Sequence, residues 1–155
     1  MTDRRYGLAD PAQFAELTGL QFLQAIINGE IPHPPICQTL GFHLTEAGDG
    51  FAAFEGETSR ALLNPLGGVH GGWSLTILDS ATACATHSKL PAGVGYGSIE
   101  TKVNFTRPIR ADLGRVRAEA TLLSMGRTIA TAEGRLTGPD GKLLAHGLST
   151  IMIMG

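Results

Sequence analysis

The sequence predicts an α+β protein in which a curved antiparallel sheet wraps around one long helix. Two observations predict this fold. Residues 70–88 form a mainly apolar run of helical character that contains one charged residue, Asp79. The stretches on both sides of this run include segments that alternate polar and apolar residues between short turns, which is typical of antiparallel strands. A lone helix that is apolar on nearly all sides has to be covered, and a sheet that curves around it supplies that cover.

The elements are expected in the order helix, two strands, long helix and about four strands. Residues 10–28 predict the first helix, because Asp10 can cap it, Pro11 suits its first turn and Gly29 ends it. Residues 31–36, IPHPPI, contain too much proline for a helix and are expected to lie extended over the surface. Strands are predicted at 38–47, 51–58, 98–107, 115–123, 127–137 and 143–154, with 93–98 as a flexible approach to the third strand.

Composition and charge exclude several classes of partner. The chain has 155 residues, of which 43% are hydrophobic and 17% charged, and a formal net charge of −2. These values suit one globular domain, and the low charge suggests that another subunit covers part of the surface. No basic stretch is longer than Arg4-Arg5, so neither nucleic acid nor an anionic membrane is expected as a partner. The first ten residues lack the apolar stretch of a secretion signal, which indicates a cytoplasmic location.

The cysteines and histidines give no sign of a redox or metal site. Cys37 and Cys84 are isolated and lack Cys-x-x-Cys spacing, so we expect free buried thiols. The five histidines do not have the spacing of metal ligands, and no metal is expected.

Asp79 lies in the middle of the long predicted helix, where a carboxylate is unfavourable. It is too far from the helix start to cap it or to gain from the helix dipole. Helical spacing places it on one stripe with small or polar residues only, namely Gly72, Thr76, Ala83 and Thr86. Because these side chains are small, another molecule can come close to this side of the helix, which favours a chemical role for the carboxylate. The alternative is a structural carboxylate bound by backbone groups or by an arginine.

Two glycines follow His70 where the long helix is expected to begin. Gly71 and Gly72 leave the first backbone N–H groups open, and these groups can hold an anion or a developing oxyanion. His70 either takes part there or only holds the entry to the helix. Gly71 and Asp79 are roughly 12 Å apart along a helix, so one helix cannot bring both to one carbonyl. Two antiparallel copies can, which predicts a site shared across a two-fold dimer interface.

These residues resemble the signature of hotdog-fold thioesterases of the PaaI (phenylacetic acid degradation) type: Asn64, the HGG of residues 70–72, and Asp79 nine positions after the histidine. The resemblance runs from about residue 36 to 154. It implies a hotdog fold, a curved antiparallel sheet around one central helix, in a domain at 36–155. An extra N-terminal helix and a proline-rich segment at 1–35 precede this domain. The resemblance also implies homodimers, often paired into tetramers, that hydrolyse acyl- or aryl-coenzyme A thioesters with no cofactor besides the coenzyme A of the substrate.

The resemblance further implies roles for individual residues. Asp79 matches the catalytic carboxylate, which acts as a nucleophile or as a base for water. Gly71 matches the residue whose backbone N–H polarises the thioester carbonyl, and His70 supports this loop and can touch the thioester. Asn64 matches a residue that orients the carbonyl or the water, and Ser98 matches a hydroxyl near the water.

Other residues are candidates for substrate binding. Gly72 offers a second open N–H at the helix start, and Trp73 is a candidate for lining the acyl pocket. Arg107 is expected near the phosphates of coenzyme A, with Lys89, Arg110 and Arg127 as further candidates.

Alternation in the strand expected at 98–107 bears on the role of Ser98. It turns Ile99, Thr101 and Val103 towards the helix, together with Phe105. Ser98 is therefore expected to face away from the helix.

Two other functions remain open on the sequence. A hotdog hydratase or dehydratase pairs a histidine with a carboxylate as acid and base, whereas the HGG at a helix start fits an oxyanion role better. A non-catalytic acyl-thioester binder is expected to lack the carboxylate or to carry a DNA-binding segment. Residues 1–35 are neither basic nor patterned as a helix-turn-helix, so hydrolysis is the preferred interpretation.

Overall fold

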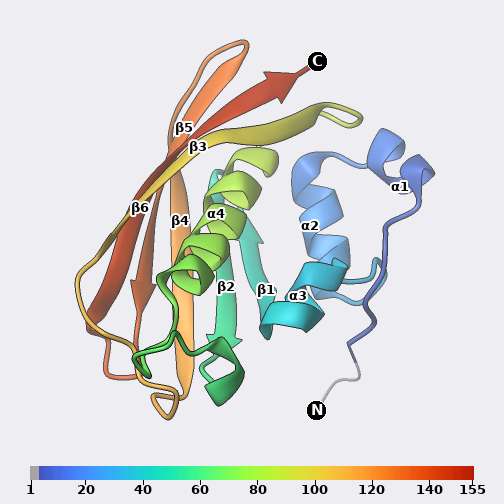
Figure 1. Cartoon of the computed structure of the whole chain (residues 1–155). Coiled ribbons are helices and arrows are strands. Elements are labelled where there is room, and N and C mark those ends of the chain that lie inside the picture. The colour runs from blue at the N-terminus through green and yellow to red at the C-terminus, as the bar shows by residue number, and fades with distance from the viewer. Residues whose placement is uncertain (1–3) are drawn as a thin grey trace.

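The structure of the protein, a computed structural model, describes residues 4–155. Its strands form one antiparallel sheet in the order β1-β2-β4-β5-β6-β3. This sheet curves around α4, as Figure 1 shows, and the predicted fold class is confirmed. The strands are β1 Phe42–Gly48, β2 Phe51–Glu57, β3 Gly95–Phe105, β4 Arg115–Met125, β5 Ile129–Thr137 and β6 Leu143–Met154.

The long predicted helix is confirmed as α4, Gly71–His87. Its buried side packs on the sheet, and β5 approaches it closely because Gly134 has no side chain; a Cβ there would lie 3.1 Å from Leu78 Cδ2. Among residues 4–155, no helix combines the length and the apolar composition needed to cross a membrane. The buried residues of α4 are Trp73, Ser74, Ile77, Leu78, Ala81, Thr82, Ala85, Thr86 and His87.

The prediction of one helix at 10–28 is wrong, because the structure has two: α1, Pro11–Glu16, and α2, Gly19–Ile27. Leu17 ends the first, and Thr18 begins the second through a capping box, in which its hydroxyl accepts from the Gln21 N–H and Gln21 Oε1 accepts from the Thr18 N–H. The Gly19 N–H also donates to the Leu90 carbonyl at 3.0 Å. The contact with the end of α4 thus fixes where α2 begins.

The prediction that residues 31–36 lie extended over the surface holds only in part, because Pro34, Pro35 and Ile36 are exposed but the segment also enters the core and a helix. Ile31 and His33 are buried, and only residues before Pro35 are extended. Pro35 begins a third helix, α3, Pro35–Leu40, as proline suits the first turn. Gly41 ends α3 with φ of 68°, and therefore β1 begins at Phe42 and not at residue 38.

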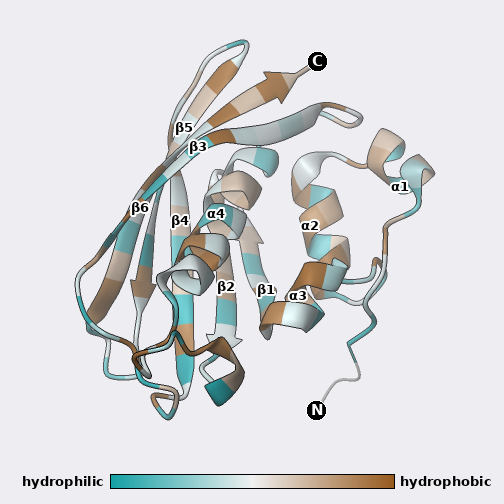
Figure 2. Cartoon of the chain, in the orientation of Figure 1, coloured by the Kyte–Doolittle hydropathy of each residue, from teal (hydrophilic) through white to brown (hydrophobic). Residues whose placement is uncertain are grey.

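Helices α2 and α3 lie next to β1 on one side of α4, and α1 lies on the outer side of α2 (Figure 1). Apolar residues of α2 and α3, brown in Figure 2, take part in packing against this side of the core. The far end of the sheet is different. There β3 is an edge strand of 11 residues, and no strand of residues 4–155 pairs with its outer side.

The register of β3 corrects the expectation for Ser98. The strand begins at Gly95, earlier than predicted, and a bulge lies between Ser98 and Glu100. The extra residue, Ile99, is 57% exposed and does not cover α4. Ser98 pairs with Ile151 and Thr101 with Ser149, two positions apart on β6, so Ser98 shares the face of Thr101. Simple alternation fails here because one bulge reverses the facing of all residues beyond it.

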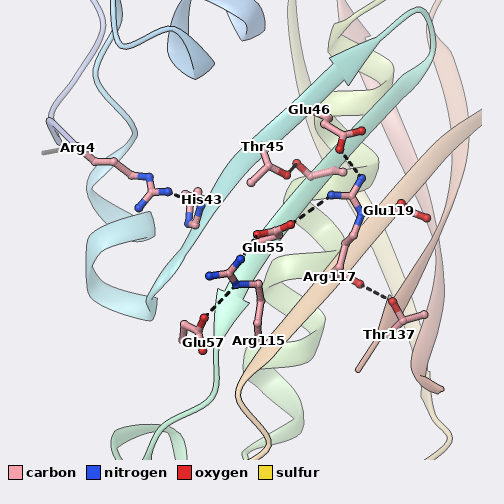
Figure 3. Close-up of polar contacts among 11 residues, drawn as sticks. Arg4, His43, Thr45, Glu46, Glu55, Glu57, Arg115, Arg117, Glu119 and Thr137 are labelled. Atoms are coloured by element: carbon pink, nitrogen blue, oxygen red, sulfur yellow. Dashed lines mark hydrogen bonds and ion pairs between the residues drawn. The ribbon is translucent and has the colours of Figure 1, made fainter. Parts of the chain in front are cut away.

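The outer face of the sheet has two unlike halves. On β1, β2 and β4 it carries ion pairs, in which Arg117 contacts Glu46 at 2.9 Å, Glu55 at 3.4 Å and Glu119 at 2.7 Å (Figure 3). Arg115 pairs with Glu57 at 3.1 Å beside them. The half formed by β5, β6 and β3 exposes the apolar side chains Ile129, Leu148, Met152 and Met154, with the exposed charged residues Lys102 and Glu133 paired on either side of Leu148.

Lowering the pH is expected to destabilise the protein through His87, which ends α4. Burial lowers the pKa of His87 from 6.5 to about 4, so the folded protein keeps the ring neutral where the unfolded chain protonates it. Unfolding therefore takes up a proton between these two values, and stability falls as the pH falls through this window. At about pH 5 the loss from this one group is about 2 kcal/mol.

Urea unfolding at about pH 7.5 and about pH 5 measures this loss. A His87→Phe variant keeps an aromatic ring beside Phe22 and Tyr96 but does not titrate, so its stability should depend less on pH. Burial also lowers the pKa of His33 and His43, which accounts for a remaining dependence. Equal pH dependence in the two proteins would contradict the assignment.

Candidate active site

Asp79 is held by a hydroxyl of β3 and not by an arginine. Thr101 Oγ1 donates to Asp79 Oδ1 at 2.6 Å, the length of a charge-assisted hydrogen bond. Thr101 Oγ1 also lies 3.1 Å from Ser149 Oγ, which lies 2.7 Å from Thr82 Oγ1. Asp79 is half-buried and forms none of the ion pairs found in residues 4–155. The carboxylate is thus oriented through one oxygen.

Sequence reasoning treated Thr101 as an ordinary strand residue and did not consider Ser149 or Thr82. The three hydroxyls come from β3, β6 and α4, and only the packing of α4 on the sheet joins them. In the sequence these three residues are recognisable only as hydroxyl residues at positions of otherwise apolar faces. Thr101 is the one that touches the carboxylate.

Replacing Thr101 with Val is expected to lower kcat about tenfold, because a hydrogen bond to a charged group contributes about 1.5–3 kcal/mol. The shape of the side chain is kept, and only the hydroxyl that orients Asp79 is lost. A Thr101→Ser variant keeps the hydroxyl and should recover most of the rate. Steady-state kinetics of the two variants check this, and equal losses in both would show that Thr101 only packs.

The start of α4 has one free donor. His70 is the N-cap, and its Nδ1 accepts from the Gly72 N–H at 2.9 Å. The His70 carbonyl accepts from the Trp73 N–H at 3.0 Å. Gly71 is the first helical residue, and its N–H has no partner within residues 4–155. His70 therefore caps the helix, and the expectation that Gly72 offers a second open N–H is wrong because His70 Nδ1 accepts from it.

The ring of Phe105 lies against Gly71. A Cβ on Gly71 would approach Phe105 Cζ to 2.9 Å, so the glycine permits this close contact. Phe105 is itself 55% exposed. A groove of about 400 Å³ lies here and is lined by Gly71, Phe105 and Arg107 together with Val69, Ser74, Thr106, Pro108 and Ile109.

Asn64 shapes the loop that leads into α4. Its Oδ1 accepts from the Leu66 N–H at 2.9 Å and from the Gly68 N–H at 3.2 Å. The Asn64 N–H also donates to the Gly68 carbonyl at 2.7 Å. The side-chain oxygen is thus occupied by the loop, and the amide Nδ2 is the group left for a substrate or water.

The remaining predicted residues fall in different places. Trp73 is only 4% exposed, and its Nε1 donates to the Leu40 carbonyl at 2.8 Å, so it belongs to the core. Lys89 and Arg110 are paired with Asp49 at 2.6 Å and Asp112 at 2.8 Å. Arg107 lines the groove at Gly71 and forms no ion pair within residues 4–155. Among the basic candidates it is the one placed beside the helix start.

The open side of α4 carries most of the predicted stripe. Gly72 is exposed, and Thr76, Asp79 and Ala83 are half-buried. Thr86 departs from the prediction: it is fully buried, and its hydroxyl donates to the Thr82 carbonyl at 3.2 Å. The accessible part of the stripe therefore ends before the last turn of the helix.

Both cysteines are unsuited to nucleophilic chemistry. Cys37 and Cys84 are free thiols. Burial raises the pKa of Cys37 to about 11 and that of Cys84 to about 12, so both stay protonated near neutral pH. Within residues 4–155, no group of three His, Cys, Asp or Glu side chains could hold a metal ion.

Comparison with known proteins places this arrangement in a family. The family model of the thioesterase superfamily matches residues 66–145, a span that includes the start of α4, Asp79 and Thr101. A protein of Halobacterium salinarum described as an esterase is 30% identical over 120 residues, which are 74% of this chain and 78% of that protein.

Solved structures agree. A phenylacetic acid degradation-related thioesterase of Ralstonia eutropha is 32% identical, with a TM-score of 0.75 over 84% of this chain and 98% of that chain. A protein of Streptococcus pneumoniae described as a hypothetical thioesterase and solved with coenzyme A shares the fold at a TM-score of 0.67 and 18% identity, over 74% of this chain and 87% of that chain. The chain thus belongs to the thioesterase superfamily and has a hotdog fold.

Proposed function

We propose that the protein hydrolyses acyl- or aryl-coenzyme A thioesters with Asp79 as its catalytic carboxylate. The observation that carries the proposal is the hydrogen bond from Thr101 to Asp79, which orients a half-buried carboxylate in the middle of the central helix of a thioesterase-superfamily chain. A carboxylate is a poor choice for this position unless it has a chemical task.

The chemistry needs few groups. Asp79 either removes a proton from water as the water attacks the carbonyl, or attacks the carbonyl itself to form an anhydride that water then hydrolyses. In both cases the C–S bond breaks and the coenzyme A thiolate leaves. Because a thiolate is a good leaving group, no strong general acid is required. A backbone N–H that holds the developing oxyanion supplies the second requirement.

That N–H is proposed to come from Gly71 of a second protomer. Gly71 and Asp79 of one helix are roughly 12 Å apart, too far to act on one carbonyl. Edge strand β3 offers 11 residues of backbone for pairing with the β3 of another copy. Antiparallel pairing across a two-fold axis would set the two α4 helices side by side with opposite directions. Each helix start would then lie next to the middle of the other.

Two further surfaces support the same assembly and substrate. The exposed apolar residues on the outer face of β5, β6 and β3, such as Leu148 and Met152, suit a second contact that pairs two dimers. The groove at Gly71 contains Arg107, which we assign to the phosphates of coenzyme A. The coenzyme A complex of the related fold from Streptococcus pneumoniae supports this substrate class.

Thiol release from a panel of acyl- and aryl-coenzyme A esters tests the proposal. We expect turnover of at least one ester, with coenzyme A and free acid formed in equal amounts. Loss of water from a 3-hydroxyacyl thioester without release of thiol would replace hydrolysis by dehydration. Tight binding of the esters without turnover would make the protein a binder.

A further inference from the structure

A second cavity lies where the N-terminal helices meet the end of α4. It measures about 200 Å³ and is lined from α2 by Phe22, Leu23 and Ile26, and from α4 and β3 by Cys84, His87 and Tyr96. Other walls come from the segments on either side of α2, from α3, β1 and β2. None of the functional roles above uses this space. Most of its wall is aliphatic or aromatic, as in sites for apolar ligands.

The wall of the cavity carries no charge near neutral pH. No Asp, Glu, Lys or Arg lines it. Burial lowers the pKa of His87 to about 4 and raises the pKa of Cys84 to about 12, so the imidazole and the thiol are both neutral. Burial likewise raises the pKa of Tyr96. A charged group would lose its hydration here without gaining a partner, so only a neutral group suits the cavity.

One polar atom of this wall has no partner. His87 is 4% exposed, and its Nδ1 is buried without a hydrogen bond in residues 4–155. The centroid of the His87 ring lies 5.5 Å from that of Phe22 and 4.6 Å from that of Tyr96. Buried polar atoms in proteins nearly always have a partner, so this unpaired nitrogen is unusual for a closed core.

The cavity lies at the end of a row of contacts between α4 and β3. From the helix start onwards, Phe105 lies on Gly71, Thr101 binds Asp79, and Tyr96 packs on His87. Cys84 follows Asp79 by roughly 7.5 Å along the helix. Asp79 itself does not line the cavity, so an acyl group would run from the carboxylate past Cys84 to reach it.

We propose that this cavity receives the acyl group of the thioester, and that α2 limits the acyl group to a compact, uncharged one of about the size of a single ring. A cavity of about 150 Å³ is sufficient for a benzene ring, so about 200 Å³ suits a ring or a chain of six to eight carbons. The assignment rests on the proposed hydrolysis at Asp79. It adds the substrate class, with the N-terminal helices as the part of the chain that selects it.

A panel of coenzyme A esters tests the substrate class. The expected order of kcat/KM places hexanoyl and phenylacetyl esters above acetyl, hexadecanoyl and adipoyl esters by about tenfold or more, since each methylene in an apolar pocket contributes roughly 1–3 kcal/mol. Adipoyl has the length of hexanoyl with a terminal carboxylate, so this pair isolates the effect of charge. Equal rates for hexanoyl and adipoyl esters would overturn the proposal.

Two opposite changes at Cys84 test the location. Cys84→Met adds volume to the wall and should lower the ratio of the hexanoyl to the acetyl kcat/KM about tenfold. Cys84→Ala removes volume and should move the preference towards octanoyl and longer chains. Phe22→Ala opens the cavity from α2 and should act in the same direction as Cys84→Ala. Thermal unfolding of each variant shows whether it is folded.

The outcomes separate the two proposals. If the wild-type protein cleaves no thioester, the hydrolysis itself is wrong and the acyl assignment falls with it. If the protein cleaves thioesters but folded Cys84 and Phe22 variants keep the wild-type chain-length preference, hydrolysis stands and the cavity is not the acyl site. A preference that shifts in opposite directions in Cys84→Met and Cys84→Ala supports the cavity.

Discussion

Replacing Asp79 with Asn is expected to lower kcat for thioester hydrolysis by about 10³-fold, within the range that a positioned acid or base contributes. The amide keeps the size of the carboxylate and can still accept the hydrogen bond from Thr101. It cannot take a proton from water at neutral pH or attack a carbonyl. Continuous measurement of released coenzyme A gives kcat and KM, and KM should change much less than kcat.

Asp140→Asn is the matched control, because it makes the same chemical change at a carboxylate in the turn between β5 and β6, paired with Lys142. Its kcat should stay within about twofold of the wild type, as is usual for surface changes. Because Asp79 is half-buried and accepts a hydrogen bond from Thr101, the thermal unfolding of both variants is compared with the wild type. Turnover by folded Asp79→Asn at the wild-type rate would remove Asp79 from the mechanism.

Replacing Gly71 with Pro is expected to lower kcat about 10²–10³-fold compared with Gly71→Ala, the usual loss for one oxyanion donor. Gly71 is the first residue of α4, the position where proline fits a helix, and proline has no backbone N–H. His70 has φ of −63° and ψ of 132°, a conformation that a following proline permits.

Gly71→Ala is the matched control for the added carbon. Both variants bring a Cβ against the exposed ring of Phe105, but only alanine keeps the N–H. The comparison therefore removes the effect of the Cβ and leaves the loss of the N–H together with the proline ring carbons Cγ and Cδ. Equal kcat in two folded variants would show that the Gly71 N–H does not hold the oxyanion.

Mixing the two inactive variants tests whether the site is shared. If Asp79 of one protomer works with Gly71 of the other, an Asp79→Asn and Gly71→Pro heterodimer keeps one intact site. Random exchange of subunits should then restore about a quarter of the wild-type activity. If both residues of a site belong to one protomer, no mixture recovers activity. Exchange is verified by native mass spectrometry of the mixed sample.

Much of this protein can be predicted from the sequence, because local chemistry decides it. The alternation of the strands and the turns between them indicate the sheet. Histidine followed by two glycines marks the start of α4, and a single carboxylate in an apolar run marks Asp79. These features depend on neighbours within a few residues, and there the prediction and the structure agree. The break between α1 and α2 was also local: it lies in the Thr18–Gln21 capping box, which the prediction overlooked.

Other features depended on contacts between distant segments. The bulge at Ile99 decides that Ser98 and Thr101 share a face, and the packing of α4 on β3 and β6 brings Thr101 to Asp79 and Ser149 to Thr101. Alternation alone could not reveal them, because a single extra residue reverses the facing of a strand and its position depends on the pairing partner. The sequence by itself thus determined the six strands, the long helix with its start, and the carboxylate, but not the three N-terminal helices. Only the tertiary structure decided which hydroxyl orients that carboxylate and which cavity lies beside it, since both arise where segments far apart in the chain pack together.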